Sequence, residues 1–101
     1  MPATQPAGRP GIIRSLARTN QFKKDYKRAL KRGYDESKLQ RIVERISKGE
    51  KLEQKHQDHP LTGEYSDCRE CHVEPGGLLI YRMTGTEVIL IRTGTHADLF
   101  E

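Results

Sequence analysis

This sequence of 101 residues is short of two things: long apolar segments and cysteine. No apolar run approaches the roughly 18–20 residues that a membrane-spanning helix needs, so we expect no association with a membrane. The first ten residues contain three of the five prolines and lack the apolar region of a signal peptide. We therefore expect a cytoplasmic protein, in which the two cysteines form no structural disulfide.

The length leaves room for one small domain and excludes a two-domain enzyme. Proline and glycine predict that residues 1–10 form a flexible N-terminal tail. Residues 11–101 contain no internal repeat, and we expect them to form a single domain.

Charged residues are plentiful and unevenly distributed along the chain. Lysine and arginine number 18 against 14 acidic residues, which gives a formal net charge of +4. Residues 1–58 contain 15 basic and 7 acidic residues, whereas residues 59–101 contain 3 basic and 7 acidic residues. The basic segment favours a polyanionic or acidic partner. Because three of the four histidines lie in the acidic segment, we expect binding and chemistry to come from different parts of the chain.

Apolar residues at helical spacing predict two helices. The first begins at Thr19 or Asn20, either of which can cap it, and ends at Gly33. The second is capped by Asp35 and ends at Gly49. We expect the two helices to pair as a hairpin whose outer faces carry basic side chains, for which solvent exposure is the simplest interpretation.

The second half of the chain is typical of a small sheet. Residues 50–67 are polar and aperiodic, which predicts a loop. An apolar cluster at Ile12, Ile13 and Leu16 predicts a short strand before the helices. The predicted fold is α+β with the order (β)ααβββ, in which the helix hairpin covers one face of a small antiparallel sheet and leaves the other face open. Two hairpin signals separate the three main strands, which we expect at residues 68–74, 78–83 and 88–93.

One short motif, Cys68-Arg-Glu-Cys71-His72, has the C-x-x-C-H form of c-type haem attachment. Haem attachment of that kind belongs to exported proteins. The alternation of side chains along a strand also places Cys68 and Cys71 on opposite faces of the sheet. The same geometry disfavours a zinc site that adds His72 and His59, although a β-bulge could restore it. We therefore expect no metal ion and no cofactor.

The strand pattern also assigns the neighbouring side chains to faces. Cys71 is in phase with Val73, and we expect both in the core. His72 is expected on the opposite face, together with Glu70 and Glu74.

Three histidines and one arginine form the stronger constellation. His59 lies on the long loop, His72 on the first main strand, Arg92 on the last strand, and His96 near the C-terminus. A three-stranded meander brings its outer strands within about 10 Å, so these four side chains can converge on the open face. Two imidazoles can supply a general base and a general acid, while an arginine stabilises a dianionic phosphorane. Such groups suit metal-independent RNA cleavage, although a single histidine is more often a surface or hydrogen-bonded residue than a catalyst.

Four blocks in a fixed order resemble the YafQ family of bacterial toxins, which belongs to the RelE/ParE superfamily. The resemblance covers roughly residues 16–100 and includes F-K-K-D-Y at the start of the first helix. The four blocks are D-H-P-L at residues 58–61, R-E-C-H-V-E-P at 69–75, L-L-I-Y at 78–81 and R-T-G-T-H-A-D-L-F at 92–100.

The resemblance implies a RelE-like fold and an mRNA interferase. Such a toxin enters the A site of the 70S ribosome, cuts mRNA there and inhibits translation. The resemblance also implies neutralisation by a DinJ-like ribbon-helix-helix antitoxin, through which operator DNA is bound.

The same resemblance implies roles for the three histidines. His96 is the leading candidate for proton transfer. His59 and His72 are candidates for its acid–base partners or for phosphate ligands.

Arg92 and Phe100 complete the site that the resemblance implies. Arg92 would stabilise the charge of the transition state, Phe100 would hold or stack a base, and Glu74 is a second candidate for substrate binding. Two structural alternatives remain open: Arg92 can instead fix Glu74 or Glu70, and Phe100 can close the core.

On this interpretation the basic helices bind ribosomal RNA through contacts that weaken as the salt concentration rises. The candidate side chains are Lys23, Lys24, Lys27, Arg28, Lys31, Arg32, Arg41 and Arg45.

The sequence departs from the family pattern at one point. Relatives have an active-site aspartate after the H-V-E-P block, followed by an aromatic or aliphatic residue, whereas Gly76 and Gly77 stand there in this chain. Activity can therefore be attenuated, or Glu74 or Asp98 can supply the carboxylate. Alternatively the chain keeps only antitoxin binding, or it is a ParE-like toxin that binds a protein such as gyrase and needs no histidines.

Overall fold

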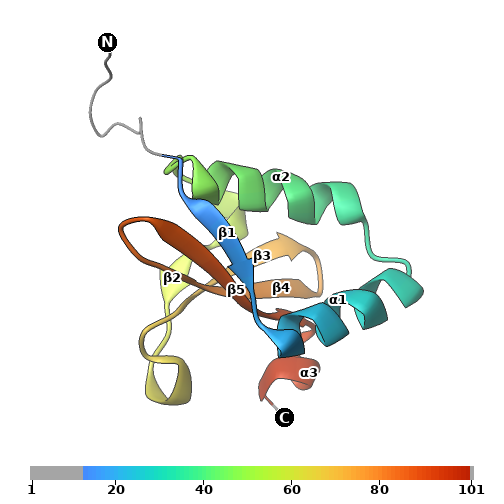
Figure 1. Cartoon of the computed structure of the whole chain (residues 1–101). Helices are drawn as coiled ribbons and strands as arrows, with labels where there is room; N and C mark the ends of the chain where they lie inside the picture. Colours follow the sequence, from blue (N-terminus) through green and yellow to red (C-terminus); the bar gives the residue numbers. More distant parts are fainter. Residues whose placement is uncertain (1–12, 101) are drawn as a thin grey trace.

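The computed structural model describes residues 13–100, which form one mixed five-stranded sheet with helices packed on it (Figure 1). The strand order is β1-β5-β4-β3-β2. The predicted tail and Ile12 lie outside the described residues, so the domain boundary stays a prediction. In chain order the elements are β1 (Ser15–Arg18), α1 (Asn20–Lys31), α2 (Glu36–Ser47), a 3-10 turn η1 (Gln54–His56), β2 (His59–Pro60), a 3-10 turn η2 (Gly63–Tyr65), β3 (Arg69–Glu74), β4 (Gly77–Met83), β5 (Glu87–Gly94) and α3 (His96–Phe100).

The two predicted helices are confirmed together with their caps. The Thr19 side chain accepts a hydrogen bond from the backbone N–H of Phe22, and the Asp35 side chain accepts one from Ser37. Each cap satisfies a backbone donor that the first helical turn leaves unpaired. None of the helices within residues 13–100 is long and apolar enough to span a bilayer.

The three main strands are also confirmed, and the α+β class with them. The sheet is not antiparallel throughout, because β1 pairs in parallel with β5 at one edge. The segment expected to be a loop contains β2, which extends the other edge by pairing with Arg69 and Glu70 of β3. The C-terminal helix α3 was not predicted.

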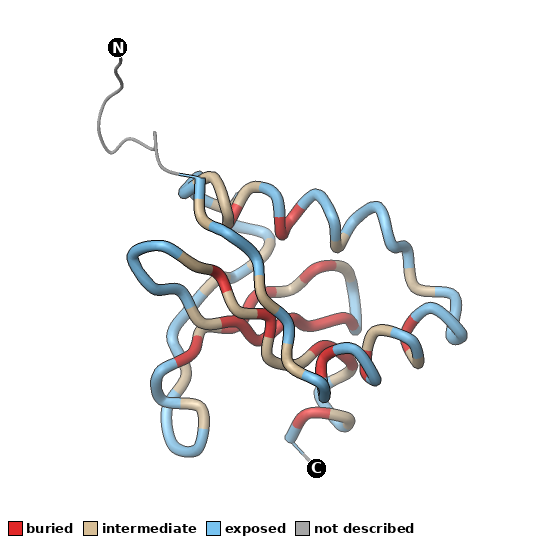
Figure 2. Tube along the Cα trace, viewed as in Figure 1, coloured by how far each residue is buried: buried red, intermediate tan, exposed pale blue. Residues whose placement is uncertain are grey.

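The buried residues are concentrated in the sheet (Figure 2) and form two apolar clusters, one on each of its faces. On the face covered by α1 and α2, Phe22, Ile42 and Ile46 pack against Leu79 and Tyr81. The expectation that the other face is open is wrong for much of its area. A second apolar cluster lies there, because α3 and the loop before β3 cover part of the sheet. It consists of Cys68, Leu78, Ile80 and Leu99, with Leu61, Tyr65 and Ile91 packed against them.

Two β-bulges decide which side chains share a face. The register between β3 and β4 shifts between His72 and Glu74. Glu74 therefore turns toward the helices, where its carboxylate accepts a hydrogen bond of 3.2 Å from the backbone N–H of Asp35. The expectation that His72 and Glu74 share a face is wrong. The register between β4 and β5 shifts in the same way, and the extra residue lets Arg92 lie opposite Ile80.

Gly94 permits a close contact between β5 and α3. Its φ is +153°, and a Cβ atom built on it would lie 2.9 Å from Oδ2 of Asp98. We expect Gly94→Ala to displace α3 and to destabilise the protein by about 1–3 kcal/mol. Thermal unfolding measures this, with Gly85→Ala as the control, because a Cβ atom there meets nothing within 4 Å. Equal unfolding temperatures for the two variants would show that the contact between Gly94 and Asp98 does not exclude a side chain at position 94.

Candidate functional site

The sheet face turned away from α1 and α2 carries most of the predicted site, and we call it the site face. Residues directly opposite each other on paired strands project to the same side. Three of the four predicted catalytic residues are thereby brought to one face, and His96 follows Gly94 by two residues. One cross-strand row contains His59, Glu70, Ile80 and Arg92, and the next contains His72, Leu78 and Gly94.

His59 has acceptors at both of its ring nitrogens. Nδ1 lies 2.7 Å from the backbone carbonyl of Gln57, and Nε2 lies 3.5 Å from Oε1 of Glu70. A carbonyl can only accept, so Nδ1 carries a hydrogen and the ring orientation is fixed. The Glu70 side chain is only 9% exposed, and its Oε2 has no hydrogen-bond partner among the described residues. His59 is thus the one close partner that the structure gives this carboxylate.

The residue before His59 anchors the segment to the sheet. Asp58 accepts hydrogen bonds from Nε of Arg69 at 2.9 Å and from the Tyr81 hydroxyl at 2.7 Å. Burial, followed by the hydrogen bond to Asp58, raises the pKa of Tyr81 well above its ordinary value, so the phenol remains a donor. This contact holds β2, and with it His59, against β3.

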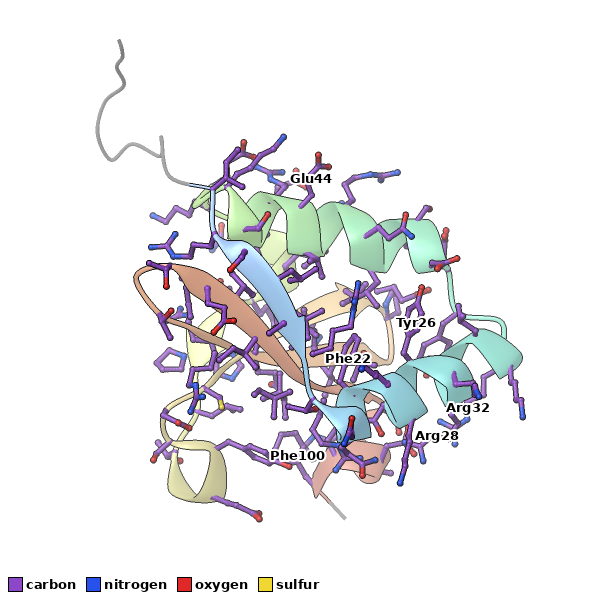
Figure 3. The ribbon with its side chains drawn as sticks, viewed as in Figure 1. Phe22, Tyr26, Arg28, Arg32, Glu44 and Phe100 are labelled. Atoms are coloured by element: carbon purple, nitrogen blue, oxygen red, sulfur yellow. The ribbon has the colours of Figure 1, made fainter. Side chains whose placement is uncertain are left out.

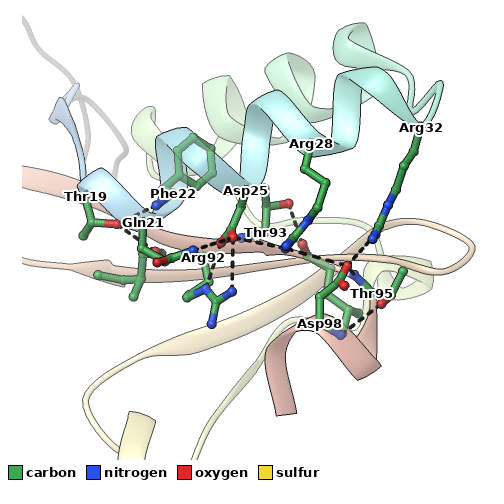
Figure 4. Close-up of polar contacts among 12 residues, drawn as sticks. Thr19, Gln21, Phe22, Asp25, Arg28, Arg32, Arg92, Thr93, Thr95 and Asp98 are labelled. Atoms are coloured by element: carbon green, nitrogen blue, oxygen red, sulfur yellow. Dashed lines mark hydrogen bonds and ion pairs between the residues drawn. The ribbon is translucent and has the colours of Figure 1, made fainter. Parts of the chain in front are cut away.

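Arg92 is held by Asp25, a buried carboxylate of α1 (Figure 4). Nε and Nη2 of Arg92 donate to the two oxygens of Asp25 at 2.8 and 3.1 Å. The backbone N–H of Thr93 and the side chain of Gln21 donate to the same carboxylate. The alternative that Arg92 fixes Glu74 or Glu70 is wrong, because its partner is Asp25. The Arg92 side chain is 20% exposed, which leaves part of its guanidinium accessible to a ligand.

Asp25 and Arg92 each stabilise the charged form of the other. Burial pushes the pKa of Asp25 upward, but hydrogen bonds from Arg92, Gln21 and the Thr93 N–H outweigh burial, and the pKa lies below its ordinary value. The hydrogen bond with Asp25 raises the pKa of Arg92 still further above its usual range. Both groups are therefore charged at neutral pH.

His96 and Phe100 lie together on α3. The two ring centroids are 5.0 Å apart, and the Phe100 ring also meets Tyr65 edge-on at 6.2 Å. Phe100 remains 40% exposed, so it does not close the core completely. An exposed imidazole beside an exposed aromatic face suits contact with a nucleobase.

Asp98 holds α3 in place from its own first turn. Its carboxylate accepts from the backbone N–H of Thr95 at 2.9 Å and from Nη1 of Arg32 at 2.7 Å. These two contacts, in that order, lower the pKa of Asp98. Figure 3 shows Arg28 and Arg32 on α1 near the end of the molecule that carries Phe100.

At the departure from the family pattern, Pro75 and Gly76 form a tight turn between β3 and β4, and Gly77 begins β4. Gly76 has a φ of +80°, as the position after the proline of a type II turn requires. Neither candidate replacement for the missing carboxylate is available to a histidine. Glu74 faces α2, and Asp98 is committed to Thr95 and Arg32. Glu70 is instead the carboxylate that the structure brings to a site histidine.

The C-x-x-C-H motif is divided between the two apolar clusters. Cys71 packs on the helix side and Cys68 on the site face, and both are buried and free. Burial, followed by the hydrogen bond to Asp67, raises the pKa of Cys68 to about 11. Within residues 13–100, no three histidine, cysteine or acidic side chains are grouped to hold a metal ion.

The eight basic candidates divide into two groups. Three are engaged by acidic side chains: Arg28 with Asp25 at 3.3 Å, Arg32 with Asp98 at 2.7 Å and Arg45 with Glu50 at 3.4 Å. The other five are exposed and form no ion pair within the described part of the chain, which leaves their charge for a partner. They are Lys23, Lys24, Lys27, Lys31 and Arg41.

Two carboxylates that contact predicted site residues, Asp25 and Glu70, were not predicted from the sequence. Asp25 lies three residues after Phe22, on the apolar stripe of α1, and a carboxylate there signals a buried cationic partner. Glu70 was placed on the correct face, but its pairing with His59 depends on β2, which the sequence pattern did not indicate.

Comparison with known proteins agrees with the fold. The family described as "Bacterial toxin of type II toxin-antitoxin system, YafQ" matches residues 14–101. The chain is 40% identical over 90 residues to the mRNA interferase toxin YafQ of Escherichia coli K12, covering 88% of this chain and 98% of the relative. It is similar to a chain of the E. coli DinJ-YafQ toxin-antitoxin complex, with a TM-score of 0.82 and 38% identity over 89% of this chain and 100% of that chain. A copper-bound mutant toxin from Helicobacter pylori has a TM-score of 0.81 and 37% identity, covering 85% and 98% of the two chains.

Proposed function

Because the chain belongs to the YafQ family of bacterial toxins of type II toxin–antitoxin systems, we propose that its site face cuts mRNA by acid–base chemistry that uses no metal. The chain is an mRNA endoribonuclease. The observation that carries the proposal for the site is that His59, His72 and Arg92 lie in adjacent cross-strand rows of one face, next to the helix that begins with His96.

In the proposed reaction, the 2′-oxygen of one nucleotide attacks the adjacent phosphorus, and the bond to the 5′-oxygen of the next nucleotide breaks. A base takes the proton of the 2′-hydroxyl and an acid protonates the leaving 5′-oxygen. The products are a 2′,3′-cyclic phosphate and a 5′-hydroxyl end. In this scheme His96 is the main proton-transfer group. His59 and His72 serve as its acid–base partners or as phosphate ligands.

Arg92 and Phe100 act on the phosphate and the base. The guanidinium of Arg92 is fixed by Asp25 through Nε and Nη2, and its accessible part donates to a phosphate oxygen as negative charge develops there. Phe100 stacks a base of the bound strand. Glu74 is not part of this arrangement, because its carboxylate faces α2.

Glu70 acts as a positioning residue for His59. We expect Glu70→Gln to slow cleavage by about 10-fold, because an unaligned imidazole is a poorer proton-transfer group. In a His59→Ala background the same change should add no further loss, since Glu70 acts only through His59. Single-turnover cleavage of mRNA on ribosomes measures the four rates.

The exposed Glu64→Gln is the matched control for Glu70→Gln and should cleave at the wild-type rate. If the losses from Glu70→Gln and His59→Ala multiply in the double variant, Glu70 acts independently of His59 and the positioning role is wrong.

The E. coli relative has been solved in complex with the antitoxin DinJ. We propose a DinJ-like ribbon-helix-helix antitoxin for this chain, with operator DNA bound through it. We further propose that the four unpaired lysines of α1 attach the toxin to ribosomal RNA in the A site of the 70S ribosome, which puts the reaction in the cytoplasm.

The test is to add the purified protein to translating ribosomes and to map the 5′ ends of the mRNA. We expect cuts in phase with codons that disappear when the antitoxin is added. Inhibition of DNA supercoiling by gyrase with intact mRNA would overturn the proposal in favour of a ParE-like toxin. Absence of growth arrest without the antitoxin would favour a chain that has lost cleavage.

A further inference from the structure

A cavity of about 420 Å³ opens between α2, η1 and β3, and we call it the β3-edge pocket. It exists because β2 pairs only with Arg69 and Glu70, which leaves the rest of β3 as an edge. His56 of η1 closes part of this edge, since its Nδ1 lies 2.6 Å from the backbone carbonyl of His72. The size is within the range of small-ligand sites.

Cationic side chains dominate the lining of the β3-edge pocket. Lys38, Arg41 and Arg45 project from one side of α2, because residues three or four positions apart share a helix face. Lys55 of η1 approaches from another element. Lysine and arginine converging from two elements are the donors that bind phosphate in proteins.

Two carboxylates also line the β3-edge pocket, but both are engaged. Glu53 lies 3.8 Å from Nζ of Lys55, and Glu74 accepts from the backbone N–H of Asp35. Among residues 13–100, no carboxylate lies within ion-pair distance of Lys38 or Arg41. Four cationic side chains line the pocket against these two carboxylates, so the lining keeps a net positive charge.

His72 connects the β3-edge pocket to the site face. It lines the pocket, and it lies opposite Leu78 in the second row of the site face. An RNA strand whose cleaved phosphate lies on the site face can thus reach the pocket around the edge of β3 with a neighbouring nucleotide.

We propose that the β3-edge pocket binds a backbone phosphate of the mRNA strand, adjacent to the phosphate that is cleaved. The proposal rests on the proposed function of the site face and extends it. Arg41 and Lys38 contact the phosphate oxygens, and Lys55 with His56 closes the pocket from the η1 side.

The test uses a fluorescent ten-nucleotide RNA with 2′-O-methyl riboses, which binds without being cut because the nucleophile is blocked. Arg41→Ala and Lys55→Ala should each weaken binding by about 3- to 10-fold. Each should also reduce the slope of log Kd against log salt by about 0.7, the value for one phosphate contact of a single strand. The matched control Lys51→Ala removes one exposed positive charge outside the pocket and should change the slope little.

Three results would overturn the proposal: no binding by the wild-type protein, unchanged slopes for both pocket variants, or an equal effect of Lys51→Ala. Weaker binding to vacant ribosomes with unchanged binding of the oligonucleotide would assign the pocket to ribosomal RNA and also overturn it. The two proposals can also fail separately. If the wild-type protein does not cut mRNA but the pocket variants still bind the oligonucleotide more weakly than wild type, the proposed function is wrong and the pocket assignment stands.

Discussion

Replacing His96 with alanine is expected to slow mRNA cleavage by about 10²- to 10⁴-fold, because general acid–base groups contribute rate factors of that size. His96 is exposed at the first position of α3, so its removal leaves no buried polar group without a partner. We therefore expect the unfolding temperature and the affinity for the antitoxin to remain near wild-type values. The rate at which 5′ ends appear on translating ribosomes measures the loss.

His96→Gln separates proton transfer from binding at the same position. Glutamine can donate a hydrogen bond to phosphate but cannot exchange a proton near neutral pH, so its loss should match that of alanine. Cleavage by His96→Gln within about 3-fold of wild type would show that His96 binds the substrate and that another group moves the proton.

Local patterns were sufficient to predict α1, α2 and the three main strands. Helical periodicity, the caps at Thr19 and Asp35, and the glycines after each helix are all properties of neighbouring residues. The pairing of β1 with β5 is different, because it joins residues that are about seventy positions apart. Nothing in the short segment around Leu16 distinguishes a parallel edge strand from an isolated apolar cluster.

The residues of the candidate site could be predicted from the sequence, but the side of the sheet on which some of them lie could not. Strict alternation along β5 would put Arg92 on the same side as Leu90, toward the helices, and the β-bulge reverses this. A bulge likewise separates Glu74 from His72. Each bulge depends on one extra residue in the register of two strands, which the sequence of either strand alone does not reveal.

The second large effect is expected from Asp25→Asn. This change removes the charge that balances Arg92 in an environment where the Asp25 side chain has no exposed surface. Breaking a buried ion pair costs about 3–5 kcal/mol of unfolding free energy, and Arg92, whose side chain is only 20% exposed, is left without its partner carboxylate. For a domain of this size the unfolding temperature should fall by more than about 12 °C. Calorimetry or circular dichroism measures the shift.

We also expect Asp25→Asn to lower the rate of mRNA cleavage, even at temperatures where the variant is folded. Asp25 fixes two nitrogens of Arg92, and a catalytic group displaced by about 1 Å can lose a factor of about 10² in rate. Asp67→Asn is the matched control, because it makes the same chemical change in an exposed ion pair with Arg82. Surface pairs contribute little, so this control should keep both its unfolding temperature and its activity.

The pH dependence of stability gives an independent check on the same pair. The pKa of Asp25 is lower in the folded protein than in the unfolded chain, where it is about 3.9. The pair therefore stabilises the fold fully above that value and loses its contribution as the pH falls through the folded pKa. The difference in unfolding free energy between the wild type and Asp25→Asn should narrow below about pH 4. A difference that stays constant from pH 7 to pH 2.5 would show that the charge of Asp25 does not hold Arg92.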